Sequence, residues 1–269
     1  MKTIKDFINC LKLHSIISGY LQKTTMKRHF FFPFLLLVIS GCSGQEKLSA
    51  KKFPDIALVN RIDFYNPKFD QPRFSCGFLL QYHSDTFAVT AKHLLKFIKP
   101  DGMATLSFEN AVKNWIFYPL TKKEDSIVTE KLLNENKTAL LADASIYEDD
   151  WLVFSIRQNH STVQALQVRT TPLVTGEKLY VIGWTRKMET GEQRVYEFAY
   201  HTTIGKRILL KELIVPEQFG GLSGGPVVDE QGLVVGIVSG GTVDPADGKK
   251  YFSPCIITGV TEFLDSYKK

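Results

Sequence analysis

Cysteine is scarce in this chain, with four in 269 residues. Two of them, Cys10 and Cys42, lie near the N-terminus, so the rest of the sequence contains only Cys76 and Cys255. At most one disulfide can then form there, which excludes the small scaffolds that depend on several disulfides. The stability of this protein has to come from a hydrophobic core.

Long apolar runs are also lacking. The most apolar stretch, from Phe30 to Ile39, is too short to span a bilayer comfortably. Two basic residues precede it and the sequence ISGC ends it, so residues 1–41 have the order of regions found in a secretory signal. The ending resembles a bacterial lipoprotein box, in which Cys42 carries the lipid, such as palmitate, and becomes the first mature residue.

The leader and the segment after it can be divided further. Met26 lies directly before the basic pair, which indicates that translation starts there and that residues 1–25 are an extension or an unusually long n-region. Residues 42–55 are polar and small, as in a lipidated tether, and residues 56–269 are expected to form the folded domain. We therefore expect an exported protein, lipid-anchored to a bacterial membrane on the periplasmic side or at the cell surface.

An excess of charge is absent once the leader is set aside. The chain has 33 Lys and Arg against 28 Asp and Glu. Residues 1–41 contain six of the basic residues and one of the acidic residues, which leaves 27 of each in the rest of the chain. A mature chain without net charge gives no reason to expect nucleic acid as a partner. Internal repeats and low-complexity segments are lacking too. About 228 residues suffice for one large all-β domain or two small ones.

Short β-like segments separated by turn residues are abundant. Alternation and β-branched or aromatic residues predict strands over residues 56–64, 74–83, 86–91, 115–120, 151–156, 178–184, 194–204 and 207–215. The amphipathic stretch 260–268 predicts a C-terminal helix. Segment 122–140 is charged and irregular, and is expected to be a surface loop between two β units. This spacing favours an all-β sandwich or barrel.

The most informative motif is GGLSGGPVV, residues 220–228, which surrounds Ser223 with glycine. Gly221 and Gly224 also satisfy GxSxG, the nucleophile elbow of α/β-hydrolases. That fold places its histidine after the serine, whereas the last histidine here is His201. The elbow serine leads into a helix, but PVV, a DEQG turn and LVVGIVSGG predict a hairpin. Ser223 is therefore expected in β structure.

A serine nucleophile needs a base, and four histidines come after the leader. His93 follows FAVTA, a predicted strand that ends in small residues, within the string TAKHLL. His83 lies beside a turn and His160 lies in a polar segment, so both are expected to be solvated. His201 lies within a predicted strand, where a hydrogen-bonded structural role is expected. His93 is the candidate base.

A histidine base also needs an acceptor that fixes its tautomer. The string EDDWLVFSI offers Asp149 and Asp150 directly before an apolar strand, although both residues could simply mark a turn. The resulting order His, Asp, Ser is compatible with the arrangement of chymotrypsin. The subtilisin order would need the aspartate before the histidine and a helix carrying the serine.

These three strings resemble the catalytic blocks of the chymotrypsin-like, or trypsin-like, serine peptidases. TAKHLL is similar to the family's TAAHC, DWLVF to DIALL and GLSGGPVV to GDSGGP, and the similarity covers residues 56–269. The resemblance implies two Greek-key β-barrels, each six-stranded, a C-terminal helix and a site in the cleft between the barrels. It assigns the base to His93, the orienting acid to Asp150 rather than Asp149, and the nucleophile to Ser223.

The resemblance also implies binding groups. The oxyanion hole would be formed by the backbone N–H groups of Gly221 and Ser223. The string SGG, which comprises Ser239, Gly240 and Gly241, is similar to the family's SWG strand, which lines the primary pocket and pairs with substrate backbone. On the same basis Cys255 aligns with a pocket-wall glycine and Glu217 lies near the pocket floor, where a carboxylate would favour Lys or Arg before the scissile bond. A surface-loop position for Glu217 remains an equal alternative.

Two departures from the family pattern are informative. Leu222 replaces the aspartate that pairs with a newly released α-amino group in trypsin-like zymogens, so activation of that type is not expected. Leu94 replaces the cysteine after the histidine, so Cys76 loses the partner that the family pattern would give it.

The function expected from this sequence is hydrolysis of peptide bonds through an acyl-enzyme, with no metal or organic cofactor. Its partners would be protein or peptide substrates and, through the lipid anchor, a membrane. The alternative is a catalytically silent lipoprotein of the same fold that binds protein through the old substrate cleft. The oligomeric state is left open by the sequence.

Overall fold

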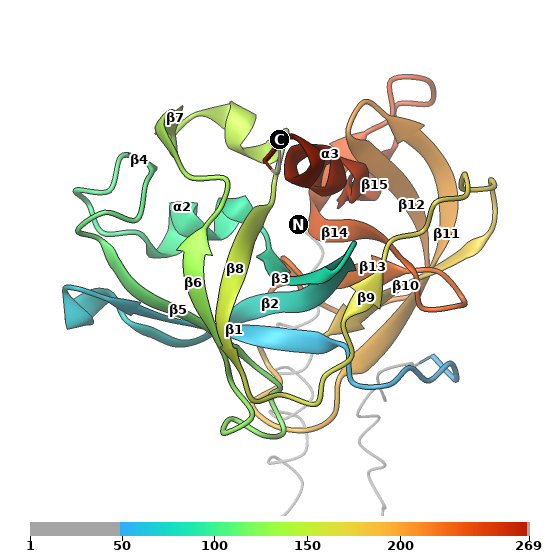
Figure 1. Ribbon diagram of the computed structural model, residues 1–269. Helices are drawn as coiled ribbons and strands as arrows, with labels where there is room; N and C mark the ends of the chain where they lie inside the picture. The colour runs from blue at the N-terminus through green and yellow to red at the C-terminus, as the bar shows by residue number, and fades with distance from the viewer. Residues whose placement is uncertain (1–48, 268–269) are drawn as a thin grey trace, which may run out of the picture. The chain divides into compact units, whose positions relative to one another are not determined.

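A computed structural model describes residues 49–267 of the chain. The expected signal, Cys42 and the first part of the tether lie outside these residues. Figure 1 shows the strands in two groups, one built from the earlier half of the described chain and one from the later half. Both groups close on themselves, so the expectation of an all-β fold with two barrels is confirmed.

The first barrel contains strands from residues 57–159. Its strands follow the order β1, β5, β6, β8, β3, β2 around the ring, and pairing between β1 and β2 closes it. The bounds are β1 (Ala57–Phe64), β2 (Gln71–Tyr82), β3 (Asp85–Thr90), β5 (Val112–Tyr118), β6 (Ile127–Leu132) and β8 (Leu152–Asn159). A short strand, β9 (Leu166–Gln167), adds to β2 in parallel.

The second barrel repeats the same strand order. It is closed in the order β10, β11, β12, β15, β14, β13, so in each barrel the third strand pairs with the sixth, as in a Greek key. The bounds are β10 (Lys178–Gly183), β11 (Arg194–Ile204), β12 (Arg207–Ile214), β13 (Pro226–Val228), β14 (Val234–Val243) and β15 (Lys250–Ile256). The chain then enters α3 (Thr258–Tyr267), the expected C-terminal helix.

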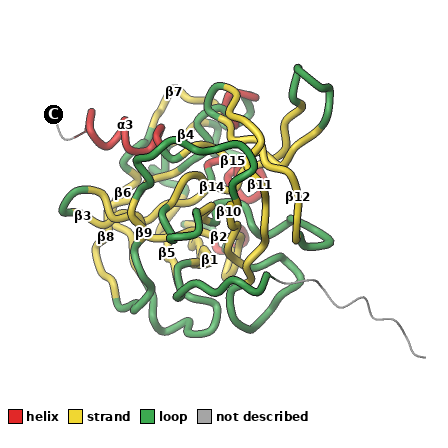
Figure 2. The backbone as a smooth tube through the Cα atoms, turned by 90° about the vertical axis from the view of Figure 1, so that its right-hand side faces the viewer, coloured by secondary structure: helices red, strands yellow, loops and turns green. Residues whose placement is uncertain are grey.

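The other elements are short. They are η1 (Pro67–Phe69), η2 (Lys92–Leu94), α2 (Leu95–Ile98), η3 (Ala144–Tyr147) and a two-stranded sheet of β4 (Thr105–Leu106) and β7 (Asn136–Leu140). Figure 2 shows α3 on the outside of the strand layers. None of the helices within residues 49–267 is long and apolar enough to cross a membrane.

Segment 122–140, expected to be a surface loop, instead supplies a strand to the first barrel. Ile127 and Leu132 at the two ends of β6 are buried, while Glu130 and Lys131 are exposed. Register shifts against β8 break the alternation of buried and exposed residues. The charged, irregular pattern was therefore misleading, because a bulged strand does not keep a strict period of two.

Three clusters of buried residues form the core. One fills the first barrel around Trp115, Phe117 and Phe154, and one fills the second around Tyr196 and Phe198. The third joins residues of both barrels with Val260 and Leu264 of α3, and includes Trp151, whose ring lies 5.4 Å from that of Phe263. Strands in the two barrels are therefore fixed relative to each other by apolar burial.

Cys76 and Cys255 are both free and buried. The Cys76 thiol lies against the backbone of Trp184, where its Sγ is 3.4 Å from the Trp184 amide nitrogen. Burial raises the pKa of the Cys76 thiol to about 12. Because the thiolate is the reactive form, this cysteine is protected by its protonation state as well as by its lack of access.

We therefore expect Cys76 to resist iodoacetamide in native buffer at about pH 8.5, where an ordinary thiol is half ionised. Peptide mass spectrometry would follow the modification, with Thr162→Cys as an exposed control thiol. Cys76 should react only after urea is added. Modification of Cys76 at the rate of the control in native buffer would contradict this account.

Candidate functional site

The pairing of β3 with β8 brings the candidate base and acid together. Thr90 and Leu152 are register partners, His93 follows the end of β3, and Asp150 precedes β8. After Ala91 the chain turns into the 3-10 helix Lys92–Leu94, whose Leu94 is buried and anchors it. Two residues that are 57 apart in the sequence therefore meet at one end of the first barrel.

A continuous hydrogen-bond chain links the three expected residues. The buried carboxylate of Asp150 accepts a bond from the His93 backbone N–H to Oδ1 at 2.7 Å, and its Oδ2 lies 2.6 Å from His93 Nδ1. With Nδ1–H donating to the carboxylate, His93 Nε2 has a free lone pair, and it lies 3.0 Å from Ser223 Oγ. His93 can then accept the proton of the serine hydroxyl. Asp149 instead pairs with Lys206.

Two residues of the second barrel extend this chain. The Ser239 hydroxyl donates a short hydrogen bond to Asp150 Oδ2, and Arg207 Nη1 donates to Ser239 Oγ at 2.8 Å. Burial raises the pKa of Asp150, but the hydrogen bonds from His93 and Ser239 outweigh it and hold the pKa below its ordinary value. Asp150 is therefore ionised at neutral pH although it is buried.

The backbone before Ser223 is arranged as an oxyanion hole requires. The Gly220 carbonyl accepts a hydrogen bond from the Arg186 amide at 2.6 Å. Because C=O and N–H point in opposite directions across a trans peptide, the Gly221 N–H faces away from Arg186. Gly221 has φ +104°, and a Cβ there would lie 2.3 Å from the Arg186 nitrogen, so only glycine fits this close approach.

The next peptide follows the same logic. The Leu222 carbonyl accepts from the Gly225 amide at 2.9 Å, so the Ser223 N–H points to the opposite side. Within residues 49–267, neither the Gly221 nor the Ser223 amide has a hydrogen-bond acceptor. Two free donors therefore lie beside the candidate nucleophile, which is the arrangement that stabilises a tetrahedral oxyanion.

The loop that carries Ser223 is fixed from both sides. Leu222 is fully buried among Leu179, Val181 and other core residues of the second barrel. On the other side the Ser223 carbonyl accepts from the Cys76 amide of β2 at 2.9 Å. Gly224, at φ +80°, packs so closely on the first barrel that a Cβ would lie 2.2 Å from Thr90 Oγ1. An apolar anchor therefore stands where the family pattern has an aspartate.

The structure keeps Glu217 away from the triad, but it places the buried Cys255 thiol against the backbone of Asp150, with Sγ 3.8 Å from the Glu148 carbonyl oxygen. The Glu217 side chain is 76% exposed and lies 3.7 Å from Lys187, which matches the surface alternative. The register of the β14–β15 hairpin places Cys255 opposite Ile237, and Cys255 is buried in the core. Gly241 belongs to the strand expected to line the primary pocket, and the residue opposite it in this hairpin is Phe252, not Cys255.

Aromatic side chains hold the loop that leads to Ser223 against the second barrel. The ring of Phe219, on this loop, lies 5.0 Å from that of Phe252 on β15, and Phe252 lies 4.8 Å from Phe198 on β11. No local sequence signal marks this stack, because its members are brought together only by barrel closure.

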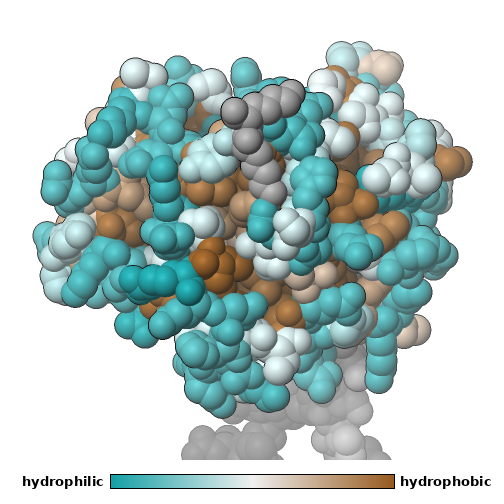
Figure 3. Space-filling view, viewed as in Figure 1, coloured by the Kyte–Doolittle hydropathy of each residue, from teal (hydrophilic) through white to brown (hydrophobic). Residues whose placement is uncertain are grey.

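The exposed surface around the site is partly apolar. Phe97, 70% exposed, lies with its ring 6.2 Å from that of His93, and Tyr147 stacks on His93 at 5.7 Å. Figure 3, which has the viewing direction of Figure 1, shows one face of the molecule that is mostly hydrophilic, with apolar residues gathered across its middle. A cavity of about 240 Å³ also borders Gly221 and is lined by Arg73 and Trp184 among others.

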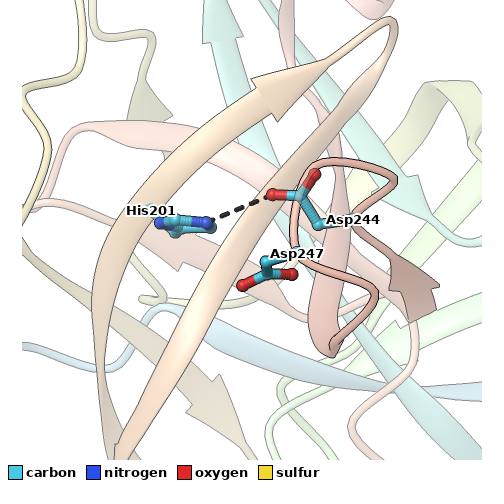
Figure 4. Close-up of side chains that lie close together, drawn as sticks. All are labelled: His201, Asp244 and Asp247. Atoms are coloured by element: carbon cyan, nitrogen blue, oxygen red, sulfur yellow. Dashed lines mark hydrogen bonds and ion pairs between the residues drawn. The ribbon is translucent and has the colours of Figure 1, made fainter.

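One cluster of potential metal ligands is found within the described chain, formed by His201, Asp244 and Asp247 (Figure 4). His201 Nε2 lies 3.2 Å from Asp244 Oδ2, and Asp247 Oδ2 accepts a bond from Tyr251. His201 Nδ1 is buried without a partner within residues 49–267. The ligand atoms of this cluster already take part in hydrogen bonds with one another or with Tyr251, which is sufficient to hold the three side chains together without an ion.

The ionisation of Asp150 gives a prediction about pH. Its carboxyl should titrate below the ordinary 3.8. Because the folded pKa is lowered, this group contributes stability that is complete above the pKa of the unfolded chain and is lost as the pH falls through the folded pKa. Replacing Ser239 by alanine removes one of the hydrogen bonds that lower the pKa, so the pKa of Asp150 should rise.

Carbon-13 NMR of the Asp150 carboxyl in wild type and Ser239→Ala would measure both values. Ser155→Ala on β8 is the matched control, because its hydroxyl bonds Glu130 rather than the site. An identical Asp150 pKa in wild type and Ser239→Ala would contradict the role given to the Ser239 hydroxyl.

Comparison with known proteins bears on the family and the fold. The family model described as Trypsin matches residues 68–266. Among solved structures, neuropsin, a serine protease of mouse brain, is 15% identical over 81% of this chain and 98% of its own, with a TM-score of 0.53. A structure titled GrC is 17% identical over 80% and 94%, also at 0.53, and the active form of the Rv3671c protease from M. tuberculosis is 14% identical over 90% and 93%, at 0.48.

Comparison with curated protein sequences gives no match. The family model nevertheless covers most of the chain, and the two closed barrels with the same strand order are consistent with it. The chain belongs to the trypsin family.

Proposed function

We propose that this protein is a serine endopeptidase that cleaves peptide bonds through an acyl-enzyme. The observation that carries the proposal is the unbroken chain of hydrogen bonds from buried Asp150 through His93 to Ser223. Membership of the trypsin family supports a hydrolase of the serine protease type acting on protein or peptide. The free amides beside Ser223 support the same chemistry.

The reaction would form an ester on Ser223 and then hydrolyse it, which restores the free serine. Ser223 Oγ attacks the substrate carbonyl carbon while its proton moves to His93 Nε2, and Asp150 stabilises the imidazolium that forms. The amides of Gly221 and Ser223 bind the oxyanion. His93 then gives its proton to the leaving amine, which departs and leaves an ester on Ser223. Water, deprotonated by His93, attacks this ester and releases the acid and the free hydroxyl.

A fluorophosphonate probe tests the proposal directly, because it phosphonylates an activated serine. We expect labelling of wild type that is lost in Ser223→Ala and retained in Ser266→Ala, a control on the exposed face of α3. Hydrolysis of a denatured protein substrate should fall by roughly 10⁴-fold or more in His93→Gln, since the triad acts as a unit. If folded wild-type protein takes up no probe, the proposal of an enzyme is overturned and the alternative, a catalytically silent binding module, is supported.

We propose further that Leu222 makes activation of the trypsin type unnecessary. Its side chain is fully buried and holds the loop without an ion pair. The first residues that the structure describes lie against β11 and not at the Leu222 loop, because the Ser49 hydroxyl donates to Glu197 on β11 at 2.6 Å. A trimmed form much more active than the untrimmed chain would argue against this proposal.

For the N-terminal region we propose export, removal of residues 1–41 and lipidation of Cys42, with the domain held at a bacterial membrane. The sequence pattern around Cys42 supports this. Cells fed labelled palmitate should incorporate it into wild type and into Cys10→Ser, but not into Cys42→Ser. Incorporation that persists in Cys42→Ser would show that another residue is modified.

A further inference from the structure

A cavity of about 620 Å³ lies beside the hydrogen-bond chain of the triad. It is lined by residues 147–148 before Asp150, residues 206–207 at the turn between β11 and β12, and residues 240–242 of β14. The proposed acyl-enzyme mechanism makes no use of it. Its most distinctive group is the half-buried guanidinium of Arg207.

Arg207 is held rigidly with one nitrogen left over. Nε donates to Ser253 Oγ at 3.1 Å, and Nη1 donates to Ser239 Oγ at 2.8 Å and to the Tyr147 carbonyl at 3.2 Å. Nη2 lies beside Gly240. A Cβ added to Gly240 would be 3.7 Å from Nη2 and would have no other atom within 4 Å. The absent side chain of Gly240 therefore leaves Nη2 open to the cavity.

The charge of Arg207 is not balanced locally. Within residues 49–267 Arg207 forms no ion pair, whereas its neighbour Lys206 is paired with Asp149 at 2.7 Å. Glu148 also lines the cavity, but its exposed carboxylate contacts neither cation. The carboxylate of Asp150 is already bonded to His93 and Ser239. A fixed, partly desolvated guanidinium whose hydrogen bonds within residues 49–267 all go to uncharged groups is suited to bind an incoming carboxylate.

The neighbouring strand can present a peptide to this cation. β13 pairs with β14 only as far as Ile237. Residues 240–243 of β14 pair with β15 on one edge and leave the other edge free in the described chain. A substrate in extended form can add to a free strand edge. Alternate side chains of such a peptide would point toward Gly240 and the cavity.

We propose that this cavity is a subsite for an acidic side chain of the peptide substrate, bound by Nη2 of Arg207. The inference rests on the proposed peptidase function and adds the class of substrate to it. Glutamate or aspartate near the scissile bond is preferred over its amide, because only the carboxylate forms a charge-assisted pair with the guanidinium.

The test is a fluorogenic peptide library in which Glu and Gln are exchanged at each of several positions on both sides of the scissile bond. Wild type should cleave the Glu member of one pair with a kcat/KM about tenfold or more above that of the Gln member, equivalent to about 1.4 kcal/mol. In Arg207→Gln the ratio should fall to near one. Gly240→Val, which covers Nη2 and keeps the arginine, should lower the ratio in the same way.

Lys211→Gln is the matched control, since Lys211 is an exposed cation on the same strand and does not line the cavity. The ratio should be unchanged in this variant. A ratio near one in an active wild type, or a Glu preference that survives in Arg207→Gln, would overturn the subsite.

Binding distinguishes this failure from failure of the peptidase function. The Glu and Gln libraries would also be titrated as two pools into Ser223→Ala, which cannot cleave them. If wild type neither cleaves the peptides nor takes up a fluorophosphonate, the peptidase function fails. The subsite is still supported in that case if Ser223→Ala binds the Glu pool more tightly than the Gln pool and the double variant Ser223→Ala/Arg207→Gln does not. Equal binding of both pools overturns it.

Discussion

The structure depends on keeping one carboxylate ionised inside the protein. Asp150 is fully buried, and a buried charge without partners would cost several kcal/mol or would take up a proton. Three hydrogen bonds offset this cost, two from His93 in the first barrel and one from Ser239 in the second. The same bonds that solvate the carboxylate fix the tautomer of the imidazole and tie the two barrels together at the point where Ser223 must lie.

The nucleophile loop is held by a different kind of force. Small residues let its backbone lie directly against Arg186 on one side and Thr90 on the other, and the burial of Leu222 holds it down. The amides of the loop are oriented by hydrogen bonds on the opposite side of each peptide, to Arg186 and Gly225. The two free amides that we propose as oxyanion donors are therefore set by backbone geometry and do not depend on a charged side chain.

Much of this could be predicted from the sequence because the relevant information was local. Strands such as residues 194–204 are rich in β-branched and aromatic residues, and the strings around His93, Asp150 and Ser223 each carry a small residue or an apolar strand where the geometry needs one. β6 was missed because its register shifts against β8 disturb the alternation. The positions of Cys255 and Glu217 could not be derived, because they depend on hairpin register and on the path of an exposed loop.

Arg207, Ser253 and the stack of Phe219 on Phe252 also lacked any signal in the sequence. Each is brought to the site by barrel closure, and contacts of that kind join residues tens of positions apart. Without an expected partner, an isolated arginine on a strand has the pattern of an ordinary surface cation. Only the side chains around it reveal that it is fixed and unpaired.

The packing of Gly224 on Thr90 and Cys76 has a consequence for biogenesis. Synthesis runs from the N-terminus, so His93 and Asp150 leave the ribosome before Ser223, and β14, β15 and α3 emerge after it. The first barrel alone has no nucleophile, and the second has no base. The chain of hydrogen bonds from Asp150 through His93 to Ser223 is therefore completed only when the two halves have docked, so the proposed peptidase would gain its activity at the last step of folding.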